Sequence, residues 1–132
     1  MPMSEHIKVV IVDDDPRLLK AYDLKFKNEG IHAHVVGESE YAIETIRNTM
    51  PDVVVLDVLM PVKNGWDILR EMQADIELNQ IPVLMVSNIG SDDKEAEAIA
   101  AGAAAYLVKS DTPLNDLVER IKLLGPNEPI QQ

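Results

Sequence analysis

Two neighbouring aspartates, Asp13 and Asp14, follow a short apolar run, and Asp57 closes another. Ser87 and Lys109 end two further apolar runs. Two unit charges at ~4 Å and an effective dielectric of ~20 repel by about 4 kcal/mol, so clustered carboxylates hold a cation or take up protons. Oxygen ligands without His or Cys suit a hard ion such as Mg²⁺. With an ammonium and a hydroxyl beside the ion, the set predicts phosphoryl-transfer chemistry.

These side chains can meet only if the apolar runs are parallel strands. The runs cover residues 7–12, 53–56, 83–86 and 104–108, and their near-continuous apolarity is typical of strands that are buried on both faces. A weaker run at 31–36 carries His32 and His34 and predicts an edge strand. Ligands of open parallel sheets bind outside the carboxyl ends of the strands, so we expect the five polar residues to converge there.

Helix signals separate the runs. Asp15 followed by Pro16 predicts a capped helix start, and Gly30 predicts its end. For the later helices the predicted markers are Ser39 as cap of the second; Leu69, Met72 and Ile76 in the third; Ser91 with Asp92 and Asp93 opening the fourth; and Thr112, Pro113, Gly125 and Pro126 bounding the fifth. Five β-α units predict one α/β domain with right-handed crossovers, over residues 1–125, followed by a short C-terminal tail at 126–132.

Composition narrows the function. A formal charge of −11 argues against direct binding to nucleic acid, which needs a basic patch. The chain has no cysteine, which excludes disulfides, thiolate metal sites and cysteine nucleophiles. No apolar run is long enough to insert into a membrane and the start lacks a signal-peptide pattern, so we expect a cytoplasmic protein.

Four segments carry a resemblance to a known family. They are VVIVDDDP, with Asp13 and Asp14; VVVLDVLMPVKNG, with Asp57; PVLMVS, with Ser87; and AAAYLVK, with Lys109. Together they strongly resemble the receiver domain of response regulators in two-component phosphorelay signalling, chemotaxis regulators included, from about residue 8 to 124. The resemblance implies a flavodoxin-like, doubly wound, five-stranded parallel sheet in the order 2-1-3-4-5, with five helices.

The resemblance also implies roles on the metal side of the site. Asp57 would accept a phosphoryl group from a sensor histidine kinase or a histidine phosphotransfer protein. Asp14 would bind Mg²⁺ directly and Asp13 through a water, with Asp57 and the backbone carbonyl of Leu59 as further ligands. Mn²⁺ could substitute for Mg²⁺.

On the phosphoryl side, the resemblance implies that Lys109 pairs with Asp57 and then with the phosphoryl group. Ser87 would hydrogen-bond that group, and Tyr106 would rotate inward behind it. The family's loop after the acceptor is matched by Met60, Pro61 and Gly65, and we expect Gly65 to need a positive φ.

The chain departs from the family at several positions. Lys109 is followed by Ser110 where the family usually has proline, so that bond is either trans or a costly cis bond. Asn88 is larger than the small residue usual there. Leu59 and Ile89 stand two residues after the acceptor and the serine, and aliphatic side chains cannot orient the hydrolytic water. We therefore predict slow self-dephosphorylation.

Three functions remain open from the sequence. The leading hypothesis is a switch that catalyses its own phosphorylation and dephosphorylation, without being a conventional turnover enzyme, and so changes its binding to an unknown downstream protein. The alternative is a phosphate-independent protein-binding module of the same fold. A hydrolase of the dehalogenase type would need a second aspartate where Leu59 stands.

Overall fold

The computed structural model describes residues 7–125, in which strands and α-helices alternate. Their bounds are β1 (Lys8–Val12), α1 (Pro16–Asn28), β2 (His32–Val36), α2 (Ala42–Thr49), β3 (Val53–Asp57), α3 (Gly65–Gln73), β4 (Val83–Ser87), α4 (Asp92–Ala100), β5 (Ala105–Val108) and α5 (Leu114–Leu124). Two 3-10 helices, η2 (Ser39–Tyr41) and η3 (Lys109–Asp111), precede α2 and α5. None of the helices in this part of the chain has the length and apolar character that crossing a membrane requires. The tail expected at 126–132, with Pro126, lies outside the described residues.

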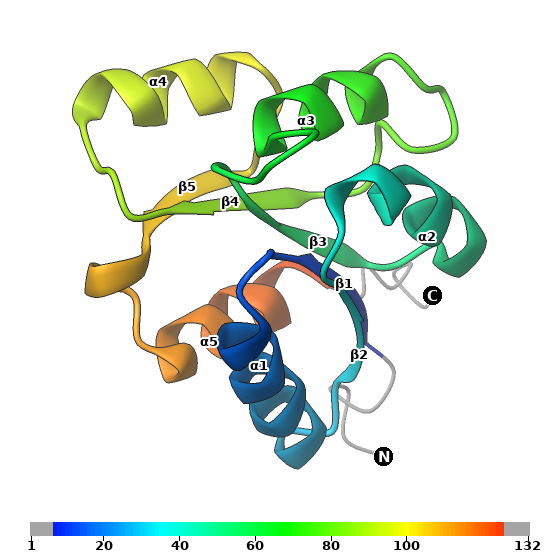
Figure 1. Cartoon of the computed structure of the whole chain (residues 1–132), viewed down its shortest axis with the longest axis vertical. Coiled ribbons are helices and arrows are strands. Elements are labelled where there is room, and N and C mark those ends of the chain that lie inside the picture. Colours follow the sequence, from blue (N-terminus) through cyan, green and yellow to red (C-terminus); the bar gives the residue numbers. More distant parts are fainter. Residues whose placement is uncertain (1–6, 126–132) are drawn as a thin grey trace, which may run out of the picture.

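All neighbouring strands pair in parallel, in the order β2-β1-β3-β4-β5. The predicted doubly wound sheet is confirmed, and β2 is an edge strand as the sequence indicated. Helices α1 and α5 cover one face of the sheet, and α2, α3 and α4 cover the other (Figure 1). Because the strands are parallel, the carboxyl ends of β1, β3, β4 and β5 lie along the same side of the sheet.

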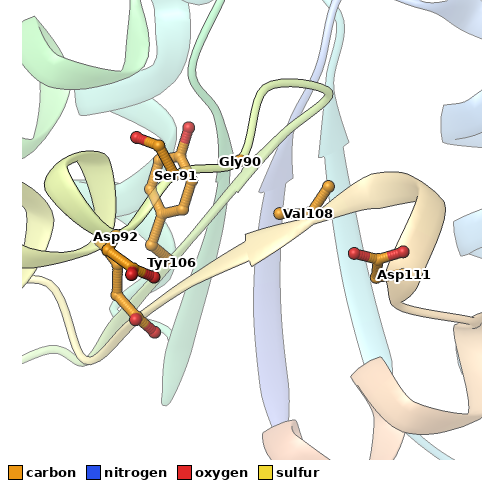
Figure 2. A pocket seen from close by; sticks show the side chains of 7 residues that line it. Gly90, Ser91, Asp92, Tyr106, Val108 and Asp111 are labelled. Atoms are coloured by element: carbon orange, nitrogen blue, oxygen red, sulfur yellow. The ribbon is translucent and has the colours of Figure 1, made fainter.

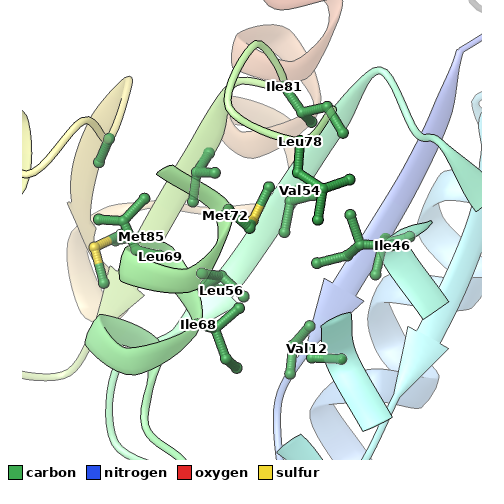
Figure 3. Close-up of a cluster of buried hydrophobic side chains, with 14 of the residues drawn as sticks. Val12, Ile46, Val54, Leu56, Ile68, Leu69, Met72, Leu78, Ile81 and Met85 are labelled. Carbon is green, nitrogen blue, oxygen red and sulfur yellow. The ribbon is translucent and has the colours of Figure 1, made fainter. Parts of the chain in front are cut away.

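The sheet separates two hydrophobic clusters. Val10 and Val12 point toward α2, α3 and α4, whereas Val9 and Ile11 point toward α1 and α5. We call the cluster on the α2–α4 side, which contains Val10, Val12 and Met72, cluster 1. Figure 3 shows Met72 of α3 packed among the side chains of the strands. Because both faces are buried, the central strands need apolar residues at nearly every position, which explains the runs in the sequence.

Two predicted helix starts, at Asp15 and Ser91, and two predicted helix ends, at Gly30 and Gly125, are confirmed. The Asp15 side chain accepts a hydrogen bond from the Arg17 N–H at 3.0 Å, and the Ser91 hydroxyl accepts one from the Lys94 N–H at 3.1 Å. Gly30 follows α1 with φ of +75°. At a helix end the backbone N–H or C=O groups lack partners within the helix, and residues of these types either bond them or let the chain turn away.

Three other helix assignments are wrong. Ser39 does not cap α2, since its hydroxyl bonds the loop after β3 instead. Thr112 does not cap α5, which begins at Leu114 with Pro113 in the cap position and without a side-chain cap. Ile76 lies beyond the end of α3 and is 87% exposed, because the chain turns after Gln73 and buries Leu78 instead.

Candidate functional site

The carboxyl edge of the sheet gathers three aspartates. Asp13 directly follows β1, Asp14 comes next, and Asp57 is the last residue of β3. One carboxylate oxygen from each lies within 4.8 Å of the others. Asp13 and Asp57 are buried, at 2% and 6% exposure, while Asp14 is open to solvent. The cluster is therefore accessible from one side, at Asp14.

Lys109 reaches into this cluster from the end of β5. Its Nζ lies 3.1 Å from Asp13 Oδ2 and 3.3 Å from Asp57 Oδ1. Three carboxylates and one ammonium leave two negative charges in a largely buried space, and a divalent cation would balance them. The three aspartates, all oxygen donors, fit a hard ion such as Mg²⁺.

Burial sets the protonation of the acceptor candidate. Burial first, and then repulsion from Asp13, raise the pKa of Asp57 to about 6, although the Lys109 ammonium opposes both. Burial alone would lower the pKa of Lys109, but Asp13 and Asp57 outweigh it and raise that pKa. At neutral pH Asp57 is thus mainly a carboxylate and Lys109 a cation, as an anionic nucleophile beside a positive charge requires.

Ser87 and Tyr106 both contact Ile89. The buried Ser87 hydroxyl, at the end of β4, accepts a hydrogen bond from the Ile89 N–H at 3.1 Å. The Tyr106 hydroxyl donates to the Ile89 carbonyl at 2.5 Å. The Tyr106 side chain is buried within cluster 1, and the inward rotation that the resemblance implies stays a prediction. Tyr106 lines a surface cleft of about 420 Å³ together with Ser91, Asp92 and Asp111. Figure 2 shows the side chains of these four residues.

Gly65 is required for a reason other than the predicted one. It begins α3, and its φ is not positive, so the expectation of a left-handed conformation is wrong. A Cβ at this position would lie 2.5 Å from the Asp57 carbonyl oxygen. The Gly65 N–H also donates to the Val58 carbonyl at 2.9 Å. Glycine here lets the start of α3 approach the backbone at the end of β3.

A comparison with known protein families identifies the family of this chain. The response regulator receiver domain family matches residues 9–122. The chain belongs to this family. Receiver domains are parts of two-component response regulators. The family that the sequence resemblance predicted is therefore confirmed.

The relatives of this receiver domain include longer proteins. The DNA-binding response regulator MtrA of Mycolicibacterium smegmatis is 30% identical over 115 residues, which are 87% of this chain and 49% of MtrA. The chain thus spans about half the length of MtrA and of the probable transcriptional regulator ycf27 of Guillardia theta. The Gliding motility regulatory protein of Myxococcus xanthus is 28% identical over 123 residues, only 16% of its length.

Solved receiver domains share the whole fold. The receiver domain of Francisella response regulator 1452 is 28% identical with a TM-score of 0.84, covering 90% of this chain and 96% of that one. The BeF3-activated N-terminal receiver domain of Klebsiella pneumoniae RstA is 27% identical with a TM-score of 0.81, covering 89% and 97%. The described residues therefore have the receiver-domain fold.

The contacts of Ser39, which the sequence indicated only as a helix cap, were not predicted. Ser39 lies at the start of η2, and its hydroxyl donates to the Pro61 carbonyl at 2.9 Å and accepts from the Lys63 N–H at 3.2 Å. Met60, next to Pro61, packs against cluster 1. The contacts of Ser39 join residues 22 and 24 positions apart, so no local pattern in the sequence could have indicated them.

Proposed function

We propose that this receiver domain takes a phosphoryl group onto Asp57 from a phosphohistidine of a sensor histidine kinase or histidine phosphotransfer protein. The acidic cluster would hold Mg²⁺, and phosphorylation would change the affinity for a protein partner. One observation carries the proposal: the Lys109 ammonium lies 3.3 Å from Asp57 Oδ1, inside a group of three clustered carboxylates. An anionic nucleophile, a cation site and an ammonium around one point are what phosphoryl transfer to a carboxylate needs, and this geometry supports the proposal.

The transfer itself needs little from the protein beyond position and charge. An oxygen of the Asp57 carboxylate attacks phosphorus, the P–N bond of the phosphohistidine breaks, and its electron pair stays on the imidazole, which takes a proton from solvent. The product is an aspartyl phosphate. Lys109 is close enough to exchange its contacts with Asp13 and Asp57 for contacts with phosphoryl oxygens.

Two further groups would complete the surroundings of the phosphoryl group. Ser87 Oγ accepts the Ile89 N–H, so its own hydroxyl proton can be donated to a phosphoryl oxygen. Mg²⁺, bound by Asp13, Asp14, Asp57 and the Leu59 carbonyl, would supply positive charge that neutralises the phosphoryl oxygens, and Mn²⁺ could do the same.

A change in partner binding requires a mechanical link from the site to the surface. Ile89 is bonded through its N–H to Ser87 and through its carbonyl to Tyr106. A new bond from Ser87 to a phosphoryl group would therefore act on the loop that Tyr106 holds, beside the cleft in Figure 2. Shifting a two-state equilibrium from 1:99 to 99:1 takes about 5.5 kcal/mol, which a few charge-assisted hydrogen bonds at about 1.5–3 kcal/mol each can supply.

The partner of this chain is expected to be a protein. MtrA is named a DNA-binding regulator, but half of its length lies outside the match. The net charge of −11 on this chain opposes contact with a polyanion. The kinase and the downstream target would be identified by their binding to the phosphorylated and unphosphorylated forms.

Intact-mass spectrometry after incubation with acetyl phosphate and Mg²⁺ tests the proposal. We expect one added phosphoryl group on the wild-type chain, and none on Asp57→Asn or in chelator. A beryllofluoride titration accompanies it, since rapid hydrolysis can hide an adduct. Absence of both an adduct and Mg²⁺-dependent beryllofluoride binding would replace the switch by a phosphate-independent binding module.

A further inference from the structure

The loop between β3 and α3 contains a turn of an unfavourable kind. The Lys63 N–H donates to the Pro61 carbonyl at 2.8 Å, and Val62 between them has φ of +72°. This is a three-residue γ-turn with a positive central φ, which is much rarer and more strained than the inverse form. A β-branched residue is especially disfavoured there. The Val62 side chain is 83% exposed, so packing does not hold it in place.

Ser39 holds this turn from another segment of the chain. Its side chain is buried, and the hydroxyl contacts both ends of the turn, as donor to Pro61 O and as acceptor from Lys63 N–H. One hydroxyl therefore satisfies the two backbone groups whose positions define the γ-turn. An ion pair between Lys63 and Glu71 also joins this loop to α3.

The turn lies close to the proposed cation site along the chain. Pro61 is two residues after Leu59 and four after Asp57. We propose that Ser39 is a positioning residue: by holding the turn at Pro61–Lys63 it fixes the backbone of residues 58–60, and so the Leu59 carbonyl, for binding of the cation. The inference rests on the proposed function, because it concerns the same site.

A purely structural role for Ser39 makes a different prediction. A buried serine that only satisfies two backbone groups stabilises the fold, and its loss lowers the unfolding midpoint without changing the affinity of the folded protein for a cation. A positioning role lowers that affinity as well, because residues that orient metal ligands typically affect metal binding when they are changed.

The test compares Ser39→Ala with Thr45→Val. Thr45 is the control, since its hydroxyl also donates to a backbone carbonyl, that of Tyr41 at 2.9 Å, but its side chain is half-buried and lies in α2, away from the turn. Mn²⁺ binding is measured by the electron paramagnetic resonance signal of the free ion. The temperature is kept well below the thermal unfolding midpoint of each variant, so that only folded protein is compared. We expect Ser39→Ala to bind Mn²⁺ about tenfold more weakly, and Thr45→Val to bind like the wild type.

Two further measurements make the result decisive. In chelator, the Lys63 amide should exchange with solvent about tenfold faster in Ser39→Ala than in the wild type. Ser39→Thr keeps the hydroxyl and should retain Mn²⁺ affinity within about twofold. Weakened binding in both Ser39 variants would trace the effect to packing and overturn the positioning role.

The outcomes separate this inference from the function on which it rests. If the wild type binds Mn²⁺ and Ser39→Ala binds it equally well, the positioning role is wrong and the cation site stands. If the wild type binds no Mn²⁺, the cation site of the proposed function fails, and the positioning role fails with it.

Discussion

The hydroxyl of Tyr106 donates a hydrogen bond to the backbone carbonyl of Ile89 at 2.5 Å, joining β5 to the loop after β4. Tyr106→Phe removes this bond and keeps the ring in cluster 1. We expect it to lower the free energy of unfolding by about 1 kcal/mol, the usual net value of such a bond. Urea unfolding measures the change. Tyr41→Phe is the control, because Tyr41 is exposed and its loss should stay within about 0.5 kcal/mol; equal losses would contradict the prediction.

Lys109 contacts two buried carboxylates, and its removal leaves them uncompensated. We expect Lys109→Met to destabilise the chelator-treated protein by about 3 kcal/mol. Lys122→Met removes an ion pair of similar length, 3.1 Å to Glu29, but from the surface of α5, and should cost less than about 1 kcal/mol. Chemical unfolding of the two variants in parallel checks the contrast. A loss for Lys109→Met no larger than for Lys122→Met would mean that the aspartates do not repel as described.

The raised pKa of Asp57, about 6, has a defined effect on stability. The folded chain holds this proton more tightly than the unfolded chain, so stability in chelator falls as pH rises from about 4 to about 6. Asp57→Asn does not titrate and lacks this fall. At pH 7 we expect the variant to be more stable than the wild type by on the order of 2 kcal/mol. Unfolding midpoints across this pH range test it, and parallel profiles for the two proteins would rule it out.

Val62 adopts a positive φ with its side chain in solvent. A non-glycine residue in such a conformation costs of order 1–3 kcal/mol, and glycine removes that cost while adding freedom to the unfolded chain. We expect Val62→Gly to raise the free energy of unfolding by about 1 kcal/mol. Val62→Ala, which keeps a Cβ, should gain clearly less. Destabilisation by Val62→Gly would show that the turn is not strained.

Leu59 and Ile89 have exposed side chains, at 58% and 54%, in the loops that follow β3 and β4. Neither side chain can hydrogen-bond a water. Slow self-dephosphorylation therefore stays a prediction, and we expect a phosphoryl lifetime well beyond seconds. A polar side chain at the first position, in Leu59→Asn, should shorten the lifetime several-fold. Release of inorganic phosphate from the purified phosphoprotein measures both. Loss within seconds from the wild type would refute the aliphatic explanation.

The fold was accessible from the sequence because its signals are local. Apolar runs bounded by polar residues gave the five strands, and the buried central strands make that pattern strong. Asp15 and Ser91 were identified as helix caps because each satisfies an N–H group two or three residues away. Similarly, Asp13, Asp57 and Lys109 were expected to meet because each stands at the end of a parallel strand.

The errors arose where distant contacts decide the structure. Ser39 has the right type and place for a cap, but the Pro61 carbonyl, 22 residues away, takes its hydroxyl. Ile76 fits a helical stripe, yet Leu78 fills the core because the chain has left the helix. Gly65 was expected to be required by a positive φ of its own. It is required instead because a Cβ there would collide with the backbone of Asp57. None of these competitors is visible in a short window of sequence.

The site is assembled from residues that are far apart in the chain, since Asp13, Asp57 and Lys109 come from the ends of three different strands. An unfolded chain cannot gather them, so any cation they hold binds the native state alone. By mass action, that cation then raises the free energy of unfolding, by about 2.7 kcal/mol at one hundred times its dissociation constant. The ionic composition of its surroundings thereby becomes one determinant of how long this domain survives proteolysis and heat.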